Sequence, residues 1–199
     1  LNIATGDFIS FVDSDDLLSV DFYKTLVETL VENNADIAEC SFHKFETEVA
    51  LVQVVETSNA TAELFETEIA LELLMKEYLN QMVWNKIYRK EVVSDFRFPV
   101  GKINEDEFWT YKVFGNSKKI VKITNVLYFY RQQEASIMGK KYALKRLDGL
   151  QALEERVAHM KEFFPNLENL AIKFFCFGAM FHYHMISKHQ EIDPTKIFR

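Results

Sequence analysis

The chain has 199 residues, a formal net charge of −7, 48% hydrophobic residues and 27% charged residues, which fits one globular domain or one domain with an appendage. The negative charge argues against a nucleic-acid binder, because phosphate backbones require a basic surface. The two cysteines form no zinc spacing or disulfide framework, and no apolar run approaches the ~20 residues that cross a bilayer, so a cytoplasmic location is expected.

The first expected element is a strand over residues 7–12. These residues are apolar, aromatic and β-branched, as is typical of strands, and three carboxylates follow them directly: Asp13, Asp15 and Asp16. Strand interiors disfavour aspartate, so the carboxylates should lie at the carboxyl end of the strand, where open α/β sheets bind ligands. Carboxylates this close repel one another unless a cation or a proton relieves them.

The remaining expected elements follow from apolar periodicity and from turn residues. In the first half they are a helix at 20–33 capped by Ser19, strands at 35–45 and 49–55 paired as an antiparallel excursion, and a helix that starts at Thr61 or Thr67 and ends near Tyr78. In the second half they are a strand or turn at 82–88, helices near 90–94 and at 105–115, strands at 120–123 and 126–130, and helices at 140–163 and 167–188. The pattern predicts an α/β core followed by a helical pair.

The acidic turn after the first strand permits two interpretations. Aspartates often occupy such turns because they cap helices and tolerate turn geometry. The same carboxylates also suit Mg²⁺ or Mn²⁺, which one or two protein carboxylates hold while substrate phosphates complete the coordination. Spacing alone leaves both interpretations open.

Four segments in order resemble glycosyltransferase family 2, the inverting enzymes that use nucleotide-activated sugars. The DxD region of that family resembles residues 4–16, ATGDFISFVDSDD, and its middle segment resembles 83–91, VWNKIYRKE. The stretch with its "ED" pair resembles 98–109, FPVGKINEDEFW, and the likeness continues at 128–138, YFYRQQEASIM. The resemblance implies a partial GT-A-like fold, in which helices flank a mixed sheet of the nucleotide-diphospho-sugar transferase type.

The resemblance also implies roles for the carboxylates. Asp13 and Asp15 match the two aspartates of the DxD motif, which implies that they hold Mn²⁺ or Mg²⁺. Asp15 is expected to ligate the metal directly and Asp13 to lie nearer the ribose or a metal-bound water, whereas the side chain of Asp16 should point elsewhere. Asp106 is the candidate general base with Glu105 beside it, although acids in the first turn of a helix can simply complement its dipole.

Four further residues receive weaker assignments. Trp84 is expected on the acceptor side, where an aromatic face can cover a sugar, although most tryptophans belong to the core. Lys86 could meet phosphate or lie on a solvated face. Arg131 and Ser136 are expected to close over the diphosphate.

The implied reaction moves a sugar from a nucleotide-diphosphate donor, a UDP-sugar above other donors, to a saccharide or lipid-linked acceptor with inversion. Bacterial surface polysaccharide synthesis at the inner face of the membrane is the expected setting. Peripheral membrane association and a homodimer are left open. Two other functions also remain open: a non-catalytic carbohydrate- or partner-binding module, and a metal-dependent nucleotidyl- or phosphotransferase.

Family members place part of the nucleotide-binding subdomain before the DxD strand, whereas six residues precede residues 7–12 here. We therefore interpret residues 1–138 as an N-terminally incomplete catalytic core and 139–199 as a helical extension. A molecule that begins at Leu1 would leave that strand unpaired on one side, which favours association and weak nucleotide binding. If the chain is catalytic, Asp15 and Asp106 should face one cleft.

Overall fold

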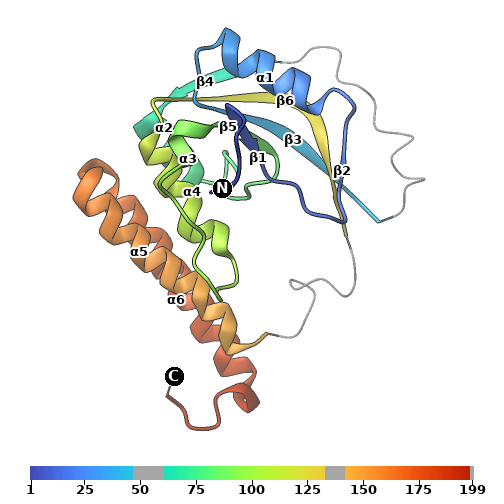
Figure 1. Cartoon of the computed structure of the whole chain (residues 1–199). Coiled ribbons are helices and arrows are strands. Elements are labelled where there is room, and N and C mark those ends of the chain that lie inside the picture. The colour runs from blue at the N-terminus through green and yellow to red at the C-terminus, as the bar shows by residue number, and fades with distance from the viewer. Residues whose placement is uncertain (47–60, 133–141, 198–199) are drawn as a thin grey trace.

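The computed structural model describes residues 1–46, 61–132 and 142–197, and all structural statements concern these residues. They form an α/β fold around a mixed sheet of order β1-β5-β3-β6-β2, in which β4 also pairs with β6 (Figure 1). The strands are β1 (Phe8–Ser10), β2 (Leu17–Leu18), β3 (Ile37–Phe45), β4 (Ala62–Glu66), β5 (Lys86–Arg89) and β6 (Lys119–Arg131). Strands β3 and β6 are parallel, and the other pairs are antiparallel. The predicted mixed sheet is confirmed.

Helices cover both faces of this sheet (Figure 1). They are α1 (Phe22–Glu32), α2 (Thr67–Met75), α3 (Lys90–Val93), α4 (Glu105–Asn116), α5 (Leu147–Phe163) and α6 (Glu168–Lys188). One hydrophobic cluster joins α1 to β3 and β6, and a second joins α2 and α4 to the opposite face. The sheet therefore lies between two cores, which fits the continuously buried run at the start of β3, from Ile37 to Cys40.

Helix α1 shows how the sequence pattern places an element. Phe22, Leu26 and Leu30 recur every four residues, and each is fully buried against the sheet. The expected cap is displaced: Asp21 occupies the N-cap position, and the Ser19 hydroxyl accepts a bond from the Asp21 N–H at 3.4 Å. Ser19 therefore stabilises the turn before the helix rather than its first turn.

The observed elements correct several predicted boundaries. Of the two expected starts of the second helix, Thr67 is confirmed and Thr61 is wrong, because Ala62–Glu66 form β4. The two strands expected at 120–123 and 126–130 are one strand, β6, of 13 residues. The helix expected from residue 140 begins at Leu147, after a 3-10 turn over Leu144–Arg146. The strand expected at 49–55 lies outside the described residues.

The helical pair after the sheet is confirmed. Helices α5 and α6 lie side by side and are joined through a 3-10 turn over Pro165–Leu167 (Figure 1). Met160, Leu167 and Ala171 of this region are buried in the same cluster as Trp109 and Phe114 of α4. The pair therefore shares a core with the α/β part. Within the described ranges, none of the helices has the length and apolarity to cross a membrane.

Candidate functional site

The acidic turn connects β1 to β2 and is held by β6. The Tyr128 hydroxyl of β6 donates to Asp16 Oδ2 at 2.6 Å and accepts the Asp13 N–H at 3.3 Å. The Arg131 N–H donates to Asp16 Oδ1 at 2.7 Å, and Arg131 Nε donates to the Asp15 carbonyl at 2.8 Å. The end of one strand therefore binds two backbone groups of the turn and both carboxylate oxygens of Asp16.

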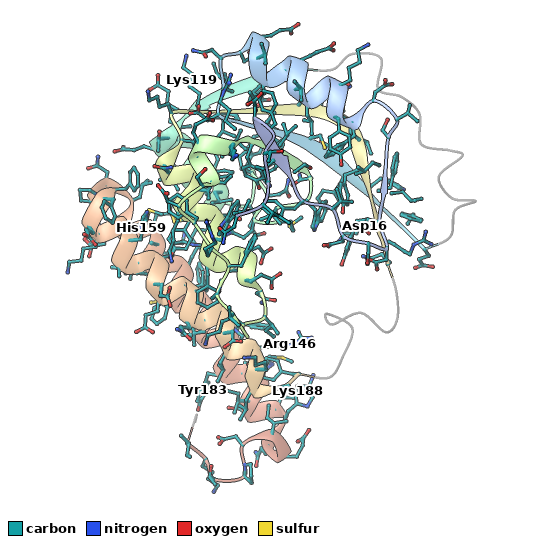
Figure 2. All side chains as sticks on the ribbon, in the orientation of Figure 1. Asp16, Lys119, Arg146, His159, Tyr183 and Lys188 are labelled. Carbon is teal, nitrogen blue, oxygen red and sulfur yellow. The ribbon has the colours of Figure 1, made fainter. Side chains whose placement is uncertain are left out.

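Asp16 has a structural role within this turn. Both of its carboxylate oxygens accept bonds from β6, and Figure 2 shows the side chain beside the end of that strand. Partial burial and the charge of Asp15 raise its pKa, whereas the bonds from Tyr128 and Arg131 oppose the rise. Asp13 and Asp15, by contrast, are exposed. The prediction that Asp16 is the poorest metal ligand of the three agrees with these contacts.

Trp84 lies beneath the turn rather than on an open face. Only 7% of its surface is exposed. Its ring stacks on Tyr128 with centroids 4.3 Å apart and on Tyr130 with centroids 5.4 Å apart. The indole thereby fixes the tyrosine that holds Asp13 and Asp16. Contact of Trp84 with an acceptor stays a prediction.

The second acidic cluster begins α4 and contains Glu105, Asp106 and Glu107. Asn104 precedes them in the left-handed region, with φ of 54°, which turns the chain sharply into the helix. The Glu107 N–H donates to Asp106 Oδ1 at 2.9 Å. Burial, followed by the charges of Glu107 and Glu105, raises the pKa of Asp106 to about 6. Such a carboxylate is ionised at neutral pH yet can accept a proton, as a general base requires.

The other two acids of α4 have different environments. Glu105 is exposed, whereas Glu107 forms an ion pair with the buried Arg156 of α5. Of these three acids, therefore, Asp106 is the one whose burial raises its pKa toward neutrality. This property supports the assignment of Asp106 as candidate base.

The two acidic clusters interact electrostatically. Partial burial raises the pKa of Asp13, and the charges of Asp16, Asp15 and Glu105 raise it further. Glu105 belongs to α4, so the field of the second cluster reaches the acidic turn. Excess negative charge at the turn favours a bound cation.

The donor set fits a divalent cation that also binds phosphate. In the part of the chain that the structure describes, no group of three or more His, Cys, Asp or Glu side chains is arranged to hold a metal ion by itself. Asp13 and Asp15 supply hard oxygen ligands, as Mg²⁺ and Mn²⁺ prefer, and such ions commonly take their remaining ligands from substrate phosphates and water.

The expectation that Lys86 contacts phosphate is wrong. The side chain is fully buried, and its ammonium lies 3.0 Å from Glu39 Oε2. It also donates to the Met82 carbonyl at 2.5 Å and to Asn85 Oδ1 at 2.8 Å. All three N–H groups therefore have protein acceptors, and a sequence pattern cannot reveal such partners.

The two residues expected to close over the diphosphate differ in what can be said of them. The Arg131 guanidinium lies over the Phe45 ring, 4.7 Å from its centroid, and beside the acidic turn. This position agrees with a role near phosphate. Ser136 lies outside the described residues.

Sequence reasoning missed Tyr128 and Gln81. Tyr128 was part of a family-like segment, but nothing in that segment indicates that its hydroxyl holds two aspartates. Gln81 Nε2 donates to the Asp106 carbonyl at 3.2 Å, and its own carbonyl accepts the Thr110 hydroxyl at 2.7 Å. No periodicity or motif marks it. A cavity of about 550 Å³ between α2, α5 and α6 is lined in part by Gln81, Glu107 and Arg156, whereas the acidic turn does not line it.

Comparisons with known proteins bear on this arrangement. Residues 1–97 match the family model of glycosyl transferase family 2. The chain is 28% identical over 180 residues to the glycosyltransferase GlyA of Streptococcus pneumoniae serotype 4, covering 86% of this chain and 26% of that protein. It is 24% identical over 157 residues to GlyG of the same organism, covering 72% and 50%. The chain thus spans about a quarter to a half of these relatives.

The fold has a counterpart among solved structures. S. aureus TarS, residues 1–349 in complex with UDP-GlcNAc, superposes with a TM-score of 0.63 at 18% identity, covering 94% of this chain and 50% of that chain. The GT-A-like fold implied by the sequence motifs is therefore confirmed, as is the resemblance to glycosyltransferase family 2.

Proposed function

Because residues 1–97 match glycosyl transferase family 2, we propose that the protein transfers a sugar from a nucleotide-diphosphate donor to an acceptor hydroxyl with inversion. The observation that supports this proposal is that two acidic clusters from distant parts of the chain lie close enough for the charge of Glu105, the neighbour of the candidate base Asp106, to raise the pKa of Asp13 in the turn. In this proposal residues 1–138 carry the chemistry and 139–199 extend them.

The acidic turn is proposed as the donor end of the site. Asp15, with Asp13 beside it, would hold Mn²⁺ or Mg²⁺, and the bound ion would supply Lewis-acid stabilisation of the diphosphate leaving group. Arg131 would add positive charge near the same phosphates. TarS binds UDP-GlcNAc with a related fold, which supports a UDP-sugar as the donor here.

Asp106 is proposed as the acceptor end of the site. It takes the proton of the acceptor hydroxyl while that oxygen forms a bond to the anomeric carbon and the bond from that carbon to the diphosphate oxygen breaks. One displacement without a covalent enzyme intermediate inverts the anomeric centre, by the geometry that governs inverting glycosidases. The proposed acceptor is a saccharide or lipid-linked saccharide of the kind that builds bacterial surface polysaccharides.

Calorimetric titration with UDP tests the donor end. Mn²⁺ should strengthen UDP binding at least about tenfold, and Asp15→Asn should remove that gain because it removes a ligand charge. Asp21→Asn is the matched control, since Asp21 is an exposed aspartate that forms no side-chain capping bond at the start of α1. An Asp15→Asn protein whose UDP affinity still responds to Mn²⁺ like the wild type would refute the assignment.

A further inference from the structure

A fully buried ion pair within the sheet takes no part in the proposed chemistry. It joins Glu39 of β3 to Lys86 of β5, with Nζ 3.0 Å from Oε2 and both side chains inaccessible to solvent. Taking two charges out of water is costly, so a buried pair persists where additional bonds satisfy its remaining atoms. The partners of this pair therefore show what it holds.

Most of those partners belong to one short segment, residues 80–82. The others are Asn85 Oδ1, 2.8 Å from the ammonium, and Lys122 of β6, 3.5 Å from Glu39 Oε1. The carboxylate of Glu39 accepts the Asn80 N–H at 3.1 Å and the Asn80 side-chain amide at 2.6 Å. The ammonium of Lys86 donates to the Met82 carbonyl at 2.5 Å. The ion pair thus binds the segment on both sides of Gln81.

Gln81 in turn holds the start of α4. Its side-chain amide donates to the Asp106 carbonyl at 3.2 Å, and its backbone carbonyl accepts the hydroxyl of the buried Thr110 at 2.7 Å. These contacts lie one helical turn apart on α4. Together they fix both the rotation of α4 about its axis and the position along that axis of the turn that carries Asp106.

We propose that Glu39 and Lys86 are positioning residues for Asp106, which act through Gln81 to hold the candidate base at the distance that sugar transfer requires. This inference rests on the proposed function. Positioning of this kind matters because a displacement of about 1 Å can cost roughly a hundredfold in rate.

Electrostatics supports the same connection. Burial lowers the pKa of Lys86, whereas the charges of Glu39 and Asp106 raise it. The charge of Asp106 therefore reaches the buried pair. Among the described residues, the other charged or titratable groups around Asp106 are Glu105 and Glu107 on its own helix and Tyr88 on β5, with Arg156 of α5 paired to Glu107.

Two variants test the proposal without leaving a buried charge unpaired. Gln81→Met keeps the length of the side chain and removes its bond to the Asp106 carbonyl. Glu39→Gln combined with Lys86→Met replaces the pair by neutral groups of similar volume, a change that folded proteins often tolerate. Lys76→Met is the control: Lys76 forms an exposed ion pair with Glu72 of α2, outside residues 80–82 and outside the buried pair.

The readouts are kcat, the KM for the donor, and the titration of the Asp106 carboxyl followed by NMR. We expect both test variants to lower kcat at least about tenfold with the donor KM within about twofold, and to move the Asp106 titration midpoint. Lys76→Met should keep the wild-type kcat and midpoint. Test variants with the wild-type kcat and midpoint would overturn the inference.

The two proposals can fail separately. A wild-type protein that turns over no nucleotide-sugar refutes the proposed function, and the Asp106 titration then decides the positioning inference by itself. A wild-type protein that is active, with a kcat indifferent to both test variants, refutes the inference and leaves the proposed function standing.

Discussion

At the scale of single residues, neighbouring carboxylates in this chain differ through their partners rather than their positions in the sequence. Asp16 gives both oxygens to β6, whereas Asp13 and Asp15 beside it remain exposed. In α4 the same division separates Glu107, which is paired with Arg156, from Asp106, which is buried enough to shift its pKa to about 6. Each cluster thus supplies a structural acid and a candidate functional acid.

The raised pKa of Asp106 predicts a cost in stability. The folded protein holds this proton up to a pH of about 6, whereas an unfolded aspartate loses it near the ordinary value of 3.8. The folded state therefore binds more protons in that window, so the free energy of unfolding falls as pH rises through it and stays lower above it.

Asp106→Asn should remove this cost. At pH 7.5 the variant should melt at a higher temperature than the wild type, by roughly 2–4 °C for each kcal/mol recovered, and the gain should vanish below about pH 4. Differential scanning calorimetry at both pH values measures this, with Asp21→Asn as the exposed control. A lower melting temperature at pH 7.5 would contradict the conclusion that burial disfavours the charged carboxylate of Asp106.

At the scale of elements, β6 organises the acidic turn. Its Tyr128 hydroxyl lies between Asp13 and Asp16, and Trp84 fixes the ring by stacking. Tyr130, two residues further on, stacks on the same indole. The end of β6 thus fixes the geometry of the acidic turn.

Tyr128→Phe tests this account of the turn. Removal of the hydroxyl should lower the free energy of unfolding by about 1–3 kcal/mol, because Asp16 loses a partner, and should weaken Mn²⁺-dependent UDP binding. Urea denaturation and calorimetric titration measure the two effects. Tyr130→Phe is the matched control, and equal effects of the two variants would show that the Tyr128 hydroxyl has no special part in holding the turn.

The sequence predicted most of the elements because apolar periodicity records which face each one buries. The acidic turn, α1, α4 and the helical pair followed from that record and from turn residues. Lys86 was misjudged because its partner Glu39 is 47 positions away and stands in an apolar strand. Periodicity does not show which distant polar groups meet, so Gln81 and Tyr128 could not have been assigned from the sequence.

At the scale of the whole molecule, the helical pair and the α/β part are built around one cluster. Met160 and Ala171 of the pair are buried with Trp109, Phe114 and Ile120 of the remainder. The Arg156–Glu107 ion pair crosses the same boundary. A shared core and a partly buried charge pair couple the two parts energetically.

This coupling predicts one cooperative unfolding transition. Trp84 and Trp109 report on the α/β part by fluorescence, while α5 and α6 contribute much of the helical signal in circular dichroism. The two signals should change at the same urea concentration, because coincident probes mark two-state unfolding. A fluorescence midpoint clearly separated from the dichroism midpoint would instead show that residues 139–199 fold as an independent unit.

In the proposed mechanism, Asp15 and Asp106 act on one sugar from two ends of a single site. Sugar transfer, screened over nucleotide-sugar donors with Mn²⁺ present, tests it most directly. We predict transfer whose rate rises with pH to a plateau above about pH 6, as the carboxylate of Asp106 loses its proton. Asp106→Asn should lower kcat at least about a hundredfold, and Asp15→Asn should abolish the dependence on Mn²⁺. Transfer at the wild-type rate by both variants would contradict the account.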